Sequence, residues 1–324
     1  MSLRRPRGPA ATMVGMRVIR EKTESVTPVW GAAAMATGIV AIGLHLVGAD
    51  WPSRGLFAIG VTIWAGLAAV FVARLAADRA RWNADAITPG ALTAIAATDV
   101  LGTWLSLFGR QNVAVGALVI AAVLWAVLLP VVVGHLRGAV PGAAYLVCVS
   151  TQSLVVLSAT LAVALPAQRF KWPAICLFVL GLLLYGLVLA HFDFKQLRTG
   201  AGDHWVAGGA IAISALAAAK LTAATHDHDV LRVVTLILVA MALAWYAVLL
   251  VCEVRWPRLR FDARRWSTVF PLGMTSVACL FSGTTLKIPA FTTLGKVLLW
   301  PAVVVWAVVA IGALRRLRVS DEPG

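Results

Sequence analysis

Ten apolar stretches, each long enough to cross a lipid bilayer, dominate this sequence. An α-helix rises 1.5 Å per residue, so about 20 residues span roughly 30 Å of hydrocarbon. With 60% hydrophobic and 13% charged residues, the chain lies far outside the composition of soluble domains. We therefore expect an all-α integral membrane protein with ten transmembrane helices. The stretches cover residues 29–49, 55–73, 91–108, 112–134, 142–165, 172–191, 205–223, 229–251, 267–284 and 291–313.

The distribution of positive charge predicts how the chain is oriented. Of the 28 Lys and Arg residues, 20 lie on the N-terminal tail, on the loops after even-numbered stretches, or on the C-terminal tail. Such residues accumulate on the cytoplasmic side of a membrane. We expect both termini in the cytoplasm, a location in the cell (plasma or inner) membrane, and contact of the basic loops with anionic lipids rather than nucleic acid. The domains would be a basic tail (1–27), a transmembrane domain (28–313) and a C-terminal tail (314–324).

A repeat organises the ten stretches. A large aromatic residue recurs near the centre of every even-numbered stretch: Trp64, Trp125, Tyr185, Trp245 and Trp306. The spacing of about 60 residues predicts five helical hairpins. The odd-numbered stretches are rich in Gly, Ala, Ser and Thr, and small residues let helices pack closely. We expect a quasi-five-fold ring in which five small-residue helices surround a central pore and five bulky helices face lipid. Alternatively, each hydroxyl bonds back to its own helix.

The segment WSTVFPLGMTSVACLFSG (266–283) combines an apolar composition with a proline. Pro271 has no amide hydrogen and its ring clashes with the carbonyl of Ser267, so the helix should kink or break there. Irregular backbone at membrane depth is tolerated where it is buried in protein or lines a water-filled cavity. Gly273 would give the bent segment room. Phe270, directly before the proline, could obstruct a narrow lumen, or it could be an ordinary packing residue.

Two ionisable residues stand out inside the apolar stretches. Asp99 lies near the middle of its stretch, where a charge is costly and suggests function. It could carry protons, form an ion pair with Lys220, or face a water-filled cavity. Lys220 itself lies toward the end of its stretch, where snorkelling to the surface is the ordinary explanation. The HDHD sequence at 226–229 supplies too few ligands for a metal site, and a solvated turn explains it better.

Enzyme classes find no support in the sequence. It has neither an H-E-x-x-H helix nor a second mid-helix aspartate that would pair with Asp99, and it lacks a G-x-x-x-x-G-K-[ST] phosphate loop. Four single cysteines have no metal or redox spacing. We expect no enzyme activity, no metal and no cofactor, and movement of a substrate would be passive or ion-coupled.

Four segments carry a resemblance to a known family: AMATGIVAI (34–42), STQSLVVLSA (150–159), HWVAGGAIAISALA (204–217) and RWSTVFPLGMTSVA (265–278). With them the chain resembles the tellurite-resistance/dicarboxylate transporter family, whose relatives include the slow anion channels of plant guard cells. The likeness extends from about residue 28 to 313. It implies a quasi-five-fold bundle with an anion pathway through each protomer, often assembled as a homotrimer. It also implies that a phenylalanine plugs the pathway, and the matching position here is Phe270.

The expected function is an anion permease or channel. Its substrates would be small anions: malate-like C4-dicarboxylates, oxyanions such as tellurite, or halides. Phe270 would be the gate, with Pro271 and Gly273 as its hinge. Alternatives are a proton-coupled anion carrier that uses Asp99, and a non-transporting membrane protein of resistance or sensing. The candidate pore-lining residues are Thr37, Gly38, Thr98, Asp99, Gln152, Ser153, Ser214 and Thr275.

Overall fold

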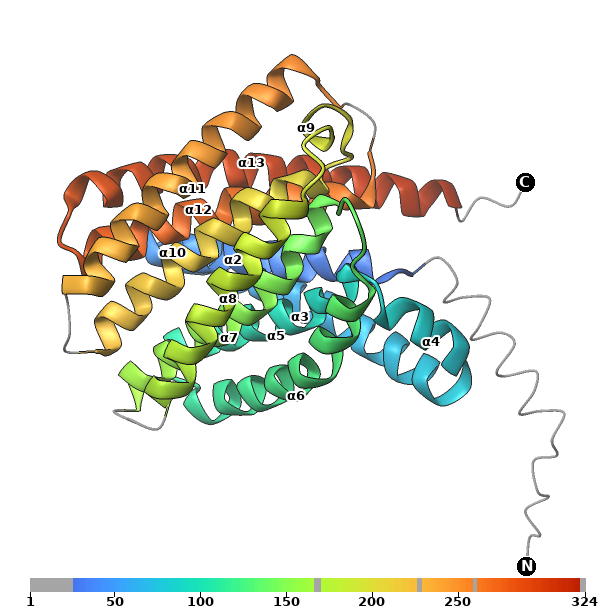
Figure 1. Cartoon of the computed structure of the whole chain (residues 1–324), viewed down its shortest axis with the longest axis horizontal. Helices are drawn as coiled ribbons and strands as arrows, with labels where there is room; N and C mark the ends of the chain where they lie inside the picture. The colour runs from blue at the N-terminus through green and yellow to red at the C-terminus, as the bar shows by residue number, and fades with distance from the viewer. Residues whose placement is uncertain (1–25, 166–169, 226–228, 259–260, 321–324) are drawn as a thin grey trace, which may run out of the picture.

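The computed structural model describes residues 26–165, 170–225, 229–258 and 261–320, and this part of the chain is almost entirely helical (Figure 1). Ten long helices follow the ten apolar stretches to within a few residues at most ends. They are α2 (Gly31–Leu46), α3 (Asp50–Ala77), α5 (Thr93–Leu107), α6 (Gln111–His135), α7 (Leu146–Ala164), α8 (Lys171–His191), α10 (Val206–Ala224), α11 (Asp229–Arg255), α12 (Trp266–Thr285) and α13 (Pro289–Ser320).

Nine helices in the described part are long and apolar enough to cross a membrane, which confirms an all-helical membrane protein. The tenth, α12, has 20 residues at the predicted place but is not among the nine. Its hydroxyl residues and its proline lower its hydropathy. Two features differ from the prediction: α13 continues to Ser320, and a short helix, α4 (Arg79–Ala86), occupies a predicted loop. Most of the predicted basic tail (1–27) lies outside the described residues, as does most of the HDHD sequence.

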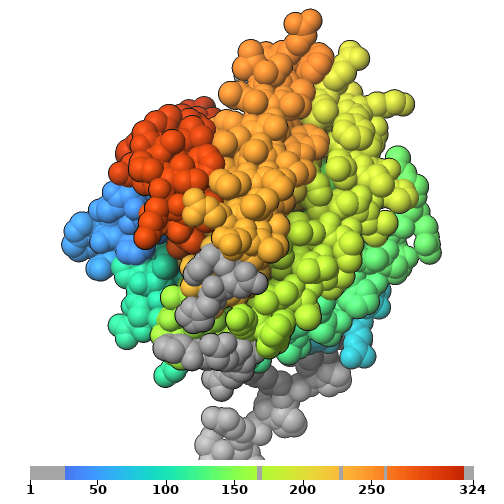
Figure 2. Space-filling view, turned by 60° about the vertical axis from the view of Figure 1, so that its left-hand side comes forward, coloured from blue at the N-terminus to red at the C-terminus, as the bar shows by residue number. Residues whose placement is uncertain are grey.

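The long helices divide into a buried set and an exposed set. In α2, α5, α7 and α10, together with the short turns before them, 72–94% of the most apolar window is buried, against 11–33% in α3, α6, α8, α11 and α13. The fifth helix of the buried set is α12, in which most residues are buried. Figure 2 shows three of the exposed helices, α13, α11 and α8, lying side by side across one face of the molecule. We call the buried set the inner helices and the other the outer helices.

Contacts between the inner helices close into a cycle. α2 contacts α5, α5 contacts α7, α7 contacts α10, α10 contacts α12, and α12 contacts α2. Each inner helix also packs against the outer helix that follows it in the chain. Small residues permit this close packing: a Cβ on Gly38 of α2 would lie 2.7 Å from Cγ1 of Val100 on α5. These are the neighbours that the predicted ring requires, while its symmetry and its pore stay predictions.

Each inner helix is preceded by a 3-10 turn. Contacts join η1 to η2, η2 to η3, η3 to η5, and η6 to η1. The N-terminal ends of the five inner helices therefore gather at one end of the bundle. A helix N-terminus carries a partial positive charge. The partial positive charges of the five inner helices therefore lie at the same end of the bundle. The turns are η1 (Pro28–Trp30), η2 (Pro89–Leu92), η3 (Gly142–Tyr145), η5 (Asp203–Trp205) and η6 (Ala263–Arg265).

Candidate functional site

A small cavity lies between the inner helices, and all five of them contribute to its wall. Its volume of about 10 Å³ is close to the minimum that holds one water molecule. Most of the wall is apolar, and the described lining comes from the inner helices alone. The lining residues are Ile39, Ile42, Asp99, Val100, Thr103, Ser153, Val156, Ile213, Leu216, Lys220, Met274, Val277 and Phe281.

Asp99 of α5 is the acidic group in this wall. Its side chain is 1% exposed, and Oδ2 accepts a hydrogen bond from Oγ of Ser153 at 2.7 Å. The other carboxylate oxygen, Oδ1, has no hydrogen-bond partner among the described residues. Two of the residues predicted to line a pore, Asp99 and Ser153, thus meet at the cavity.

Lys220 of α10 is the basic group in the same wall. It does not snorkel to the surface, because the residue is only 5% exposed and borders the cavity. Its Nζ lies 3.5 Å from the centroid of the Phe281 ring, a cation–π contact. No ion pair within 4.0 Å joins Lys220 to Asp99 in the part of the chain that the structure describes, so the suggested pair is not formed in this arrangement.

Phe270 lies in the next layer, toward the N-terminal ends of the inner helices. It is fully buried and lies one turn before Met274, on the face of α12 that also carries Val277 and Phe281. On α10, Gly209 lies one turn before the cavity residue Ile213, and a Cβ there would be 3.3 Å from Cδ1 of Phe270. The phenyl ring thus packs against the bare backbone of α10.

The proline does not interrupt the helix. α12 runs unbroken from Trp266 to Thr285, so of the two predicted outcomes, a kink or a break, the break does not occur. Gly273 allows close approach of α2, since a Cβ there would lie 3.0 Å from Cγ2 of Ile39. Pro271 and Gly273 have packing roles in this arrangement, and a hinge stays a prediction.

The other six pore candidates do not border the cavity. The Thr37 hydroxyl accepts a hydrogen bond from Nε1 of Trp306 at 3.0 Å, and Nε2 of Gln152 donates to the carbonyl of Phe178 at 3.1 Å. Both groups are thereby directed toward outer helices. Ser214 bonds back to its own helix. The full set away from the cavity is Thr37, Gly38, Thr98, Gln152, Ser214 and Thr275.

Sequence reasoning missed most of the cavity wall. Lys220 was considered as an ion-pair partner of Asp99 or as a residue that reaches the surface, and the large apolar residues of the inner helices were not considered as lining. A signal was available on α12, where positions 274, 277 and 281 share the helical face of Phe270.

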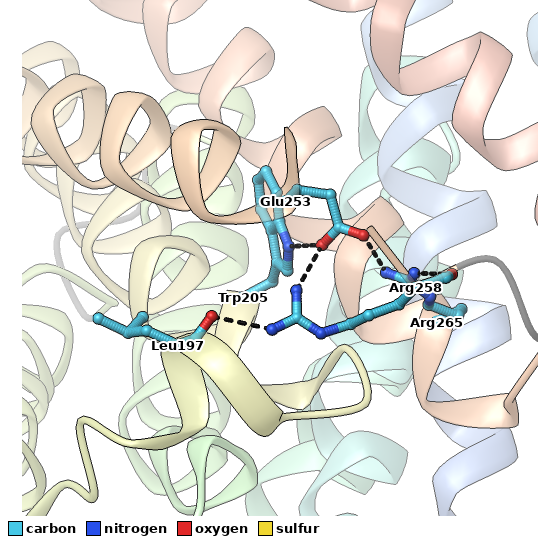
Figure 3. Close-up of polar contacts among 5 residues, drawn as sticks. All are labelled: Leu197, Trp205, Glu253, Arg258 and Arg265. Carbon is cyan, nitrogen blue, oxygen red and sulfur yellow. Dashed lines mark hydrogen bonds and ion pairs between the residues drawn. The ribbon is translucent and has the colours of Figure 1, made fainter. Parts of the chain in front are cut away.

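An ion cluster fixes the start of α12 (Figure 3). Glu253 of α11 accepts hydrogen bonds from Arg265 at 2.8 Å, from Arg258 at 3.1 Å and from Nε1 of Trp205 at 3.2 Å. Arg258 also donates to the carbonyl of Leu197 at 2.8 Å, and Arg265 donates to the carbonyl of Arg258. Because Arg265 directly precedes α12, the cluster ties the helix that carries the phenylalanine to α9 (Gln196–Thr199), η5 and α11.

Comparison with known proteins agrees with this architecture. The voltage-dependent anion channel family, SLAC1, matches residues 25–314. Two relatives from Mycobacterium tuberculosis, "Uncharacterized membrane protein MT1776" of strain CDC 1551 / Oshkosh and "Uncharacterized membrane protein Rv1735c" of strain ATCC 25618 / H37Rv, are each 32% identical over 146 residues. Those matches cover 40% of this chain and 73% of each relative. The family match covers most of the chain and confirms the resemblance found in its sequence, so the chain belongs to the SLAC1 family of anion channels and transporters.

Proposed function

We propose that this protein is an anion channel or permease of the cell membrane, with both termini in the cytoplasm and a pathway along the axis of the inner helices. One observation carries the proposal: a cavity whose described lining comes from all five inner helices and from no outer helix. Each protomer would contain its own pathway, and a homotrimer would hold three. Membership of an anion-channel family supports this assignment.

Phe270 is the proposed gate, and the arrangement described above is a closed one. The ring lies one layer from the cavity, on the cavity-facing side of α12, and it packs against Gly209. A space for about one water molecule does not admit a hydrated anion. Hydrophobic constrictions gate by excluding water. Opening would require the ring to leave the axis, with Pro271 and Gly273 as the proposed hinge.

Electrostatics favour an anion at the mouth next to Phe270. The five inner helices begin at this end, so their dipoles present partial positive charge to it. Arg258 and Arg265 lie beside the start of α12, where they share one carboxylate, that of Glu253, so that the three residues keep a net positive charge. A positive mouth raises the local concentration of anions and their rate of entry.

The candidate substrates come from the resemblance to the tellurite-resistance/dicarboxylate transporter family. The candidates are small anions: halides, oxyanions such as tellurite, and malate-like C4-dicarboxylates. Paired arginines would fix the geometry of a dicarboxylate, and the described lining contains none. A proton-coupled carrier is the second candidate, favoured by the position of Asp99 in the wall.

Efflux of chloride, nitrate and malate from liposomes tests the gate. Phe270→Ala should raise the flux of permeant anions about tenfold or more, since removal of roughly 1.4 kcal/mol from a barrier gives a factor of ten. Phe178→Ala is the matched control, because this buried ring lies on the outer helix α8, away from the cavity. If the wild type, Phe270→Ala and Phe178→Ala all show no efflux of any anion, the proposal is overturned and the non-transporting role in resistance or sensing is favoured.

A further inference from the structure

Lys220 is a buried basic residue that forms no ion pair within 4.0 Å with any described residue. Its side chain borders the cavity from α10, its ammonium group lies over the Phe281 ring, and no described residue forms an ion pair or a hydrogen bond with it. An aromatic face stabilises a cation only partly, and an ammonium group has three hydrogen-bond donors. The donors of Lys220 are therefore available to a ligand that enters the cavity.

Asp99 is the complementary group on α5. It borders the same cavity, and Oδ1 lacks a hydrogen-bond partner among the described residues. A buried charge is costly unless it is compensated. The described lining contributed by α2, α7 and α12 contains no titratable side chain, so Lys220 and Asp99 are the titratable pair that faces this space.

We propose that Lys220 binds a monovalent anion within the pathway and that Asp99 is its counter-charge while the site is empty. The inference rests on the proposed function and assigns the binding group and the class of anion. With both side chains charged, the cavity is neutral, and an arriving anion would make it negative. A proton on Asp99 restores neutrality. Anion occupancy is thus linked to protonation of Asp99, and acid favours occupancy.

The class of anion follows from the same geometry. One ammonium group acts as a point charge and offers no planar fork for two carboxylates. With Asp99 protonated, the single charge of Lys220 balances one negative charge, and a second charge on the anion would stay uncompensated. The single charge of chloride or nitrate matches the charges of this site once the pathway opens, whereas the two charges of malate do not.

Binding is measured first on the full-length protein in detergent, by the rise in unfolding temperature that nitrate produces. Nitrate should stabilise the wild type, with a larger shift at acidic pH. Lys220→Met should abolish the shift, and Lys220→Arg should retain it. Lys296→Met, an exposed lysine on α13, is the control and should respond as the wild type does. In Asp99→Asn the shift should persist and depend less on pH than in the wild type, because Lys220 is then the one titratable group left in the described lining.

Flux in a Phe270→Ala background gives the second readout. Adding Lys220→Met should raise the nitrate concentration at half-maximal flux about tenfold or more, because a charge contact of a few kcal/mol is lost. The inference is overturned if nitrate stabilises Lys220→Met as well as it stabilises the wild type, or stabilises neither. If nitrate stabilises only proteins with Lys or Arg at position 220 while Phe270→Ala shows no nitrate flux, the binding site is supported and the proposed pathway is not.

Discussion

At the residue scale, three of the five repeated aromatics, Trp64, Trp125 and Trp306, donate hydrogen bonds between hairpins. Their spacing was readable from the sequence, but their partners were not, because spacing gives the depth of a side chain and not the direction it faces. Thr37 and Thr98 were predicted to line a pore from their hydroxyls alone, and in the structure both hydroxyls accept from an outer helix of another hairpin. The bonds are Trp64 to Thr98 at 2.8 Å, Trp125 to Thr151 at 3.0 Å, and Trp306 to Thr37 at 3.0 Å.

Replacing Trp306 tests the bond that joins the last hairpin to the first. Trp306→Phe leaves the buried hydroxyl of Thr37 without this donor, and the free energy of unfolding should fall by about 1–3 kcal/mol. Trp300→Phe is the control on the same helix, since Trp300 is 59% exposed and its loss should change stability by less than about 0.5 kcal/mol. Unfolding in detergent measures both variants, and equal losses would show that the bond adds nothing.

At the element scale, α10 and α12 pack closely against each other at Gly209 of α10. The sequence indicated a distortion at Pro271, but the helix continues because the proline removes a single backbone hydrogen bond, the one to Ser267. The sequence did not reveal that Gly209 of α10 lies opposite Phe270 and Pro271. That contact depends on the rotation of both helices about their axes, which a pattern dominated by small residues all round does not fix.

Substitution of the glycine should therefore disturb both helices. A Cβ at Gly209 would lie 2.8 Å from Cγ of Pro271, and Gly209→Ala should lower the free energy of unfolding by about 1–3 kcal/mol. Gly186 of α8 is the matched control, because nothing lies within 4 Å of its added Cβ. Gly186→Ala should be neutral or stabilising by up to about 1 kcal/mol. The same loss of stability in both variants would contradict this account of the contact between α10 and α12.

At the scale of the whole molecule, composition predicted which helices are buried and which are exposed, but it did not predict the cavity between the inner helices. Hydropathy located the long helices, and the contrast between small and bulky residues predicted which ones are buried. The turns before the inner helices were not predicted, although prolines at 28, 89 and 141 were a visible signal. The cavity wall was missed because most of it consists of ordinary apolar residues, which become a lining only when five helices converge.

The most direct test of an anion pathway along this axis is chemical modification of one cysteine in the Phe270→Ala protein. The native cysteines, Cys148, Cys176, Cys252 and Cys279, are first replaced by serine. A cysteine is then introduced at Met274 in the cavity wall, or at Leu183, which is 67% exposed on α8. Each protein is treated in liposomes with a charged thiol reagent while chloride efflux is recorded. We predict that modification at Met274 reduces efflux and modification at Leu183 does not. Efflux that responds at Leu183 and stays constant at Met274 would contradict a pathway through the inner helices.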